Sequence, residues 1–192
     1  EGIRWTVVAT MRLDGARAVS SNPALPPPVM ASEDGAARVE ELHGWLRDLD
    51  VDLGAGAGWV VDIEERPGGA SGVVECPAVD GQHPARDTAD GLLDAALTVV
   101  ARAVLVAFPG ARAAGGVTSV QRLHVAVDRV VPGRAYVDAE VSASTEGAPT
   151  LTADVTVTSA AGRLLARLHG LTLHARPVHP VGAAAASALP ED

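Results

Sequence analysis

Alternating hydrophobic and polar positions in the second half of the chain predict a series of strands. Over 135–143 and 151–158, apolar residues alternate with Asp, Glu, Ser and Thr. Because successive side chains of a strand point to opposite faces, each strand should have one dry and one wet face. Further strands are expected over 117–127 and 163–175. In the last of them the apolar positions change from even to odd numbers at Gly170, which predicts a bulge or bend there.

The first half of the chain predicts one amphipathic helix and a hairpin. Apolar residues spaced three and four apart indicate a helix over 37–50. The glycine-rich segment LGAGAG follows, and then come two β-rich runs, GWVVDIEE and ASGVVECP. The turn-forming sequence RPGG at 66–69 lies between these runs and favours a hairpin.

A segment over 90–108 is apolar on almost every side. After its first turn it carries only three polar side chains, those of Asp94, Thr98 and Arg102. A helix of this kind is normally buried in a core. Residues suited to cap its N-terminus come just before it or at its start: Asp87, Thr88 and Asp90.

The predicted order is two strands, a long buried helix and four antiparallel strands. This order wraps an antiparallel sheet round one central helix, which is the α+β arrangement called the hot-dog fold. The domain is expected to span 37–176. Residues 1–36 should hold one strand over 4–13 and a proline-rich connection, and residues 177–192 an Ala/Pro-rich linker.

Composition narrows the partners and the compartment. A formal net charge of -9 without a Lys/Arg cluster argues against nucleic acid and anionic lipid as partners. The sequence has no export signal at its start and no apolar run of membrane-spanning length, so we expect a cytoplasmic protein without a membrane span. Cys76 is the only cysteine, which excludes an internal disulfide and indicates a buried thiol. The histidines show no metal-ligand spacing.

The central helix contains the sequence GLLDAALT over 91–98. It resembles the second catalytic motif of dehydratase domains from modular polyketide synthases, in which a Leu-Leu-Asp-Ala-Ala-Leu core carries the catalytic Asp. The resemblance extends in order and spacing from about Val39 to Arg176, and it is to the C-terminal half of a double hot-dog domain. It implies that Asp94, with a histidine of the first half, removes water across the α and β carbons of an acyl thioester.

The chemistry of a carboxyl group supports this role for Asp94 independently. A buried carboxyl is costly to ionise, so burial raises its pKa toward values useful for proton transfer. A helix N-terminus acts in the opposite direction because it favours the carboxylate. An Asp in the first turn of a helix can also serve only to match the helix dipole, and this structural role is the alternative for Asp94.

The chain departs from the family pattern at several positions. The His motif of the first half has no counterpart. Thr98 stands where the family has a Gln or His that hydrogen-bonds the catalytic Asp. Leu53 and Ala57 stand at the Tyr and Phe of a Tyr-Gly-x-x-Phe turn that walls the substrate tunnel. His83, in a His-Pro-Ala sequence similar to one that precedes the family motif, is a candidate for the mouth of the pocket, with a surface-loop histidine as the plainer alternative.

Three functions are compatible with these residues. The departures favour a dehydratase-like domain redirected to other β-carbon chemistry, such as branching, heteroatom addition to an enoyl thioester or ring closure. The first alternative is an ordinary dehydratase whose His-bearing half lies outside this sequence. The second is a non-catalytic structural domain of the synthase, since all three functions share one fold.

The resemblance also implies partners. They are an acyl carrier protein and neighbouring synthase domains, with the substrate on a phosphopantetheine arm and no cofactor of the domain's own, and a homodimer is left open. The arm should enter by a tunnel that passes the N-terminal end of the central helix. Because carrier proteins are typically acidic, we expect a weak docking surface that uses Arg122, Arg129 and Arg134.

Overall fold

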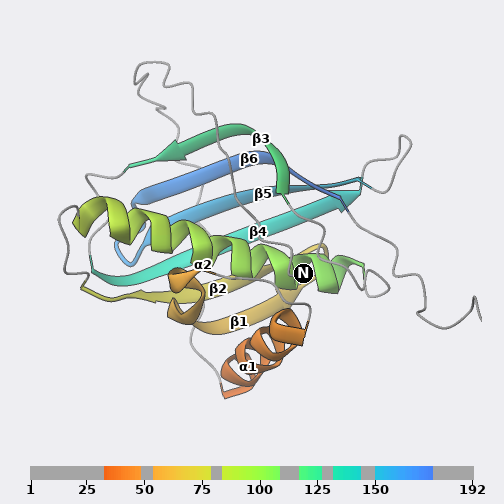
Figure 1. Ribbon diagram of the computed structural model, residues 1–192, viewed down its shortest axis with the longest axis horizontal. Helices are drawn as coiled ribbons and strands as arrows, with labels where there is room; N and C mark the ends of the chain where they lie inside the picture. Colours follow the sequence, from red (N-terminus) through yellow and green to blue (C-terminus); the bar gives the residue numbers. More distant parts are fainter. Residues whose placement is uncertain are drawn as a thin grey trace, which may run out of the picture.

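The computed structural model describes residues 33–48, 54–78, 84–108, 117–126, 132–143 and 150–174. Its strands form one antiparallel sheet in the order β1-β2-β4-β5-β6-β3 (Figure 1). Their bounds are β1 Val60–Arg66, β2 Gly69–Cys76, β3 Val117–Val125, β4 Gly133–Ala143, β5 Thr150–Ser159 and β6 Leu164–His174. The predicted hairpin and the four later antiparallel strands are therefore confirmed.

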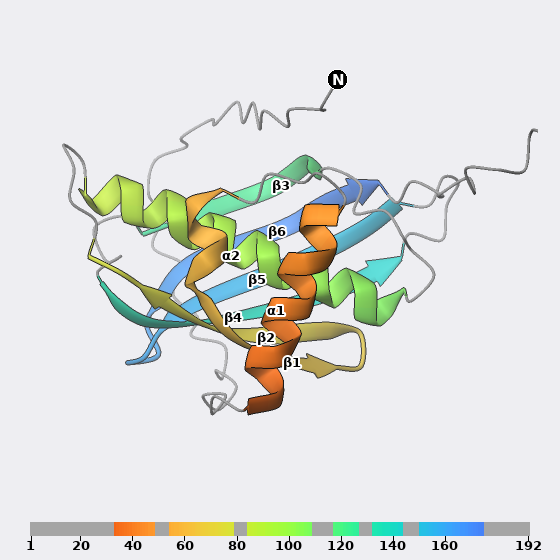
Figure 2. The ribbon, with the colours of Figure 1, turned by 60° about the horizontal axis from the view of Figure 1, so that its bottom comes forward.

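The helix α2, Pro84–Ala107, lies across one face of this sheet (Figures 1 and 2). Within the sheet it packs mainly on β2 and β4 and to a smaller extent on β1 and β5, and it also packs against the short 3-10 helix Ala55–Trp59. Its fully buried residues include Leu92, Ala96 and Val99, which belong to the same core cluster as Ile63 of β1 and Val137 of β4. The sheet wraps round one central helix, as expected for a hot-dog fold.

The alternating pattern of β4 and β5 gives these strands a dry face, toward α2, and a wet face, here called the outer face of the sheet. In β4 the odd-numbered residues from Ala135 to Val141 are buried, and the even-numbered ones lie on the outer face. Arg66 of β1 reaches across this face to Asp138, with Nη2 2.6 Å from Oδ1, and to Glu140. Burial raises the pKa of Asp138 above its ordinary value, although Arg66 acts in the opposite direction.

A bulge lies at Gly170, where the sequence predicted one. Ala153 pairs with Leu171 but Val155 pairs with Leu168, so Asp154 alone faces the two residues between them. Gly170 has a φ of 64°, which favours glycine, and its N–H donates to Oδ1 of Asp154 at 2.8 Å. The bulge explains why the apolar positions of β6 change phase.

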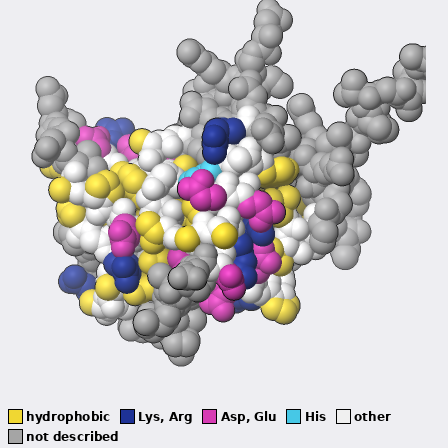
Figure 3. Space-filling model, turned by 90° about the horizontal axis from the view of Figure 1, so that it is seen from below, with side chains coloured by type: hydrophobic (Ala, Val, Ile, Leu, Met, Phe, Trp, Pro, Cys, Tyr) yellow, Lys and Arg dark blue, Asp and Glu magenta, His cyan; other side chains and the backbone are white. Residues whose placement is uncertain are grey.

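The helix α1, Glu33–Asp48, packs along the edge strand β1. Its buried hydrophobic residues are Val39, Leu42 and Leu46, three of the apolar positions that predicted the helix. Figure 3 shows the molecule from below, with hydrophobic, acidic and basic side chains interspersed on that face. The three buried residues thus form one apolar stripe along α1.

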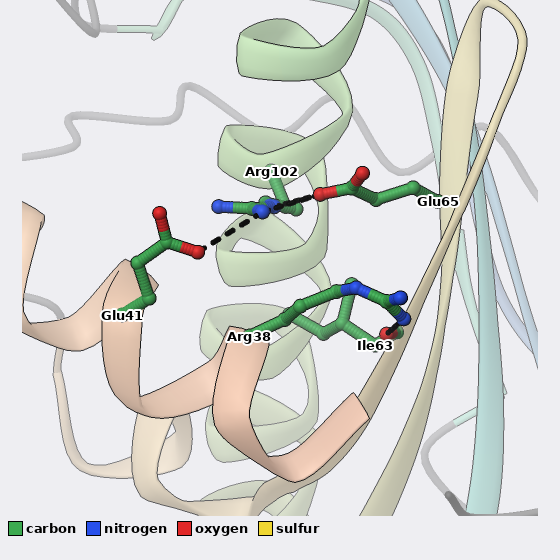
Figure 4. Close-up of polar contacts among 5 residues, drawn as sticks. All are labelled: Arg38, Glu41, Ile63, Glu65 and Arg102. Carbon is green, nitrogen blue, oxygen red and sulfur yellow. Dashed lines mark hydrogen bonds and ion pairs between the residues drawn. The ribbon is translucent and has the colours of Figure 1, made fainter. Parts of the chain in front are cut away.

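A nearly buried arginine of α2 joins α1 to β1 (Figure 4). The side chain of Arg102 is 13% exposed. Its Nε donates to Oε1 of Glu65 on β1 at 2.6 Å, and its Nη2 donates to Oε2 of Glu41 on α1 at 3.2 Å. From α1, Nη1 of Arg38 donates to the carbonyl oxygen of Ile63 at 3.2 Å. These contacts tie three elements together on one side of the sheet.

Two predicted boundaries were wrong. The central helix begins at Pro84, six residues before the expected position 90, because proline is well suited to the first turn of a helix. The first helix begins at Glu33, inside the segment assigned to the proline-rich connection. The predicted strand over 4–13 and the linker over 177–192 lie outside the described residues.

Two further observations concern single features of the chain. Cys76 is buried, as expected, and burial raises the pKa of its thiol to about 11. Among the described helices, none is long and apolar enough to cross a membrane.

Candidate active site

Asp94 lies about three turns into α2, not in its first turn. The predicted N-caps Asp87, Thr88 and Asp90 are inside the helix, and the Thr88 hydroxyl donates to the carbonyl oxygen of Pro84 at 2.7 Å. Because the dipole effect of a helix falls off within its first turn, it does not account for an Asp at position 94. The structural role considered as the alternative for Asp94 is therefore wrong.

The Asp94 side chain is half-buried and faces the segment 54–59, here called the glycine turn. This turn consists of Gly54 and the short 3-10 helix Ala55–Trp59. The backbone N–H of Gly56 donates to Oδ2 of Asp94, with the two atoms 3.5 Å apart. At this distance the N–H is a weak donor that favours one orientation of the carboxylate.

The glycine turn approaches α2 more closely than side chains would allow. A Cβ on Gly54 would lie 2.7 Å from Cγ of Asp94 and still closer to its Oδ2. A Cβ on Gly56 would overlap the backbone of Gly91, and the Trp59 ring occupies the space that a Cβ on Gly91 would need. The three glycines and Trp59 therefore form a close junction beside Asp94.

Thr98 is close to Asp94 but contacts its backbone. The buried Thr98 hydroxyl donates to the carbonyl oxygen of Asp94 at 2.9 Å, the usual bond of a helical threonine to the residue four positions earlier. Its one hydroxyl hydrogen is used in this bond, so it does not donate to the Asp94 carboxylate. The structure places the backbone N–H of Gly56 at the carboxylate instead.

The other predicted site residues are distributed differently. His83 and Leu53 lie outside the described residues, whereas Ala57 is buried within the glycine turn. The histidines whose side chains the structure describes are His43 of α1, His124 of β3 and His169 of β6. Of these, His169 lies on the outer face, with Nδ1 2.8 Å from Oδ1 of Asp154. Within the described ranges no group of three His, Cys, Asp or Glu side chains is placed to hold a metal ion.

Two of the arginines predicted to dock a carrier protein, Arg122 and Arg134, lie within the described residues, on strands β3 and β4 that are not neighbours in the sheet. Arg134 of β4 is paired with Glu75 of β2, Nη2 to Oε1, at 2.7 Å. Arg129 lies outside the described residues. Arg122 of β3 is exposed on the outer face, next to a second arginine that the prediction did not include, Arg167 of β6.

Four exposed residues on β3 and β6 form what we call the basic edge cluster: Arg122, His124, Arg167 and His169. Arg122 pairs across the strands with His169, and His124 pairs with Arg167. Neither arginine forms an ion pair with any residue of the described ranges. The cluster stands out in a chain whose formal net charge is -9. The sequence contained its signal, namely two basic positions at alternate residues on each of two predicted strands.

Sequence comparison identifies one matching family model. It is described as the polyketide synthase dehydratase N-terminal domain and matches residues 21–182. The comparison with curated proteins found no match. The description names an N-terminal domain, whereas the motif over 91–98 resembles the second half of a dehydratase. The assignment to the second half stays a prediction that rests on this motif.

Solved structures of dehydratase domains share the fold. The dehydratase domain from the CurJ module of the curacin polyketide synthase has a TM-score of 0.57 and 15% identity, over 71% of this chain and 48% of that chain. For a variant of the PpsC dehydratase domain from Mycobacterium tuberculosis the values are 0.56 and 20%, over 72% and 49%. The present chain thus spans about half the length of these solved chains.

Proposed function

The chain belongs to the polyketide synthase dehydratase family, and on that premise we propose that it acts on the β-carbon of an acyl thioester bound to a carrier protein. Asp94 is the proposed general acid or base, which moves a proton to or from the oxygen substituent of that carbon. The observation that carries this proposal is the position of Asp94, half-buried about three turns into α2 with its carboxylate held by a backbone N–H.

Simple dehydration requires two proton-transfer groups. A base removes the α-proton, the bond between the β-carbon and its oxygen breaks, and an acid protonates the leaving hydroxyl, so that water and an enoyl thioester are formed. Asp94 can supply one of these groups. The resemblance assigns the second group to a histidine of the first hot-dog half, whereas the histidines whose side chains the structure describes lie on α1, β3 and β6.

We propose that the domain is redirected from simple dehydration to branching or to addition of a nucleophile to an enoyl thioester. Two observations support this proposal. The Thr98 hydroxyl is bonded to the helix backbone instead of the Asp94 carboxylate, and a buried alanine, Ala57, stands at the position of a family aromatic. In such an addition a bond forms between the nucleophile and the β-carbon and the C=C π bond breaks, so that one group can take the proton from the nucleophile and deliver a proton to the α-carbon.

The second candidate function is ordinary dehydration with a histidine from another polypeptide segment. The observation that favours it is length, since the chain spans about half of the solved dehydratase chains that it resembles. In both cases the substrate is carried on the phosphopantetheine arm of an acyl carrier protein, the domain uses no cofactor of its own, and the reaction takes place in the cytoplasm beside other synthase domains.

Replacement of Asp94 by Asn tests the proposal. Asp94→Asn keeps the shape of the side chain and removes proton transfer, so turnover of a carrier-bound β-hydroxyacyl or enoyl thioester should fall by about 10²-fold or more. The matched control is Asp90→Asn, one turn earlier on α2, where the carboxylate is 67% exposed and lies 3.9 Å from Arg86. This control should turn over normally.

The two substrates separate the two candidate functions. Turnover of the enoyl thioester by this chain alone, with an added nucleophile, would favour redirected chemistry. Formation of enoyl product from the β-hydroxyacyl thioester only when a His-bearing domain is added would favour ordinary dehydration. Normal turnover by Asp94→Asn would contradict both candidate functions. The remaining alternative would then be a non-catalytic, structural domain of the synthase.

A further inference from the structure

The contact between the glycine turn and Asp94 depends on the absence of side chains. At Gly54, any Cβ would overlap the Asp94 carboxylate, and the φ of 69° at this residue is one that L side chains rarely adopt. Gly56 both donates its N–H to Oδ2 of Asp94 and lies against the backbone of Gly91. Two alternate residues of the turn therefore contact the same carboxylate.

The turn is itself fixed on α2. The Trp59 ring lies where a side chain on Gly91 would be, one turn of helix before Asp94. Gly91 is buried, and Trp59 packs against the core cluster. The turn therefore packs against the same side of α2 that carries Asp94, and it cannot shift without displacing Trp59 from Gly91.

We infer that the glycine turn is a positioning device for Asp94, with Gly54 and Gly56 as positioning residues that select the rotamer of its carboxylate. This inference rests on the proposed function for its catalytic consequence. Gly56 contributes a donor that favours one orientation, and Gly54 contributes the space in which that orientation fits. A carboxylate displaced by about 1 Å from its productive position can lose about 10²-fold in rate.

Gly54→Ala is the variant that tests this inference. The carboxylate is the far end of a side chain, so it can rotate away from the new methyl group, and the variant should fold with Asp94 in another rotamer. We expect turnover to fall by about 10- to 100-fold with little change in KM, because orientation acts on the chemical step more than on binding. We also expect a change in the midpoint of the pH titration of the Asp94 carboxyl carbon, measured by ¹³C NMR.

Two glycines of the same chain provide matched controls. Gly58→Ala adds a methyl group to the same turn at a position with no atom within 4 Å. Gly68→Ala adds one at a φ of 75°, also with no atom within 4 Å, and so reproduces the backbone strain of Gly54 without its contact. In both controls, turnover and the Asp94 titration should stay as in the unmodified chain. Of the two controls, only Gly68→Ala should lower the melting temperature, by several degrees.

A double-mutant cycle tests the contact without any assay of activity. If Gly54 is required because of the carboxylate, Gly54→Ala should destabilise the native chain more than it destabilises the Asp94→Ala variant. Equal destabilisation in the two backgrounds would overturn the inference.

The two readouts also separate this inference from the proposed function. Loss of turnover in Asp94→Asn together with an unchanged titration in Gly54→Ala would refute the positioning role alone. A shifted titration in Gly54→Ala, together with normal turnover in Asp94→Asn, would support the positioning role and refute the catalytic assignment.

Discussion

The two edge strands of the sheet differ in how the chain covers them. At one edge, α1 packs along β1, and Arg38 donates to the carbonyl oxygen of Ile63. At the other edge, β3 has consecutive exposed residues over 118–122, and no described strand lies beyond it. Its apolar Val120 is 38% exposed.

This difference shows which edge the chain satisfies by itself. An edge strand presents unpaired N–H and C=O groups, which either bond to water or pair with another chain unless something covers them. At β1 the covering helix belongs to the same chain and is held by charge-assisted hydrogen bonds. At β3 the outer face carries the basic edge cluster. We therefore expect substitutions at the β1 edge to lower the free energy of unfolding, and substitutions at the β3 edge to weaken the binding of other molecules.

The largest expected effect comes from removing a core contact at the covered edge. Leu42 of α1 is fully buried, so Leu42→Ala loses its packing and leaves a cavity. Such truncations cost about 2–5 kcal/mol of unfolding free energy. Denaturant unfolding would measure the loss, and hydrogen exchange should become faster in β1 while that of β5 changes less. Exchange that rises equally in both strands would show that α1 is not specific to this edge.

A smaller effect is expected from the ion pairs that join α1, α2 and β1. Arg102→Met keeps much of the apolar stem and removes the bonds to Glu65 and Glu41. Because the arginine is 13% exposed and its Nε bond to Glu65 is short, we expect a loss of about 1–2 kcal/mol, of which the exposed Glu41 contributes little.

The matched control for Arg102 is Arg86→Met, on the same helix. Arg86 and Asp90 form an exposed pair with their charged atoms 3.9 Å apart. Pairs of this kind contribute less than about 0.5 kcal/mol. Equal effects of the two substitutions in denaturant unfolding would contradict the role assigned to Arg102. High salt should reduce the effect of Arg102→Met only in part, because screening is weaker for partly buried charges.

The covered part of the fold was largely predictable from the sequence. The spacing of Val39, Leu42 and Leu46 indicated α1, and the phase change at Gly170 indicated the bulge. These features depend on residues close together in the chain, where periodicity is the main signal. The start of α2 was missed because Asp87, Thr88 and Asp90 are typical of an N-cap, although Pro84 already begins the helix.

In the candidate site the sequence predicted Asp94 and the turn that contains Ala57, but not the contact of Gly54 and Gly56 with the Asp94 carboxylate. The resemblance to a family motif identified Asp94, but the glycine turn that contacts it is far away in the sequence and carries no hydrophobic period. The alternate glycines Gly54 and Gly56, together with Gly91 in an apolar helix, were the available signal for a close approach. Sequence spacing alone does not say which two glycine segments meet, because that depends on how α2 packs on the sheet.

The smallest effect on stability, and the largest on association, is expected from the basic edge cluster at the β3 edge. Arg122→Ala with Arg167→Ala removes two exposed charges that form no ion pair within the described part of the chain. Unfolding free energy should stay within about 0.5 kcal/mol, as for most surface substitutions. If an acidic carrier protein docks there, two rim charges of about 0.2–1 kcal/mol each would weaken binding by about 2- to 30-fold.

The control for this pair carries the same charge change at other sites. Arg47→Ala with Arg86→Ala removes two exposed arginines from α1 and α2, so it lowers the net charge equally without touching β3 or β6. Binding of the acyl carrier protein would be measured by titration at low and high salt. The first pair should lose affinity and part of its salt dependence, whereas the control should retain both, because attraction between exposed charges acts over about one Debye length. Equal losses in the two pairs would mean that net charge, and not the β3 edge, attracts the carrier.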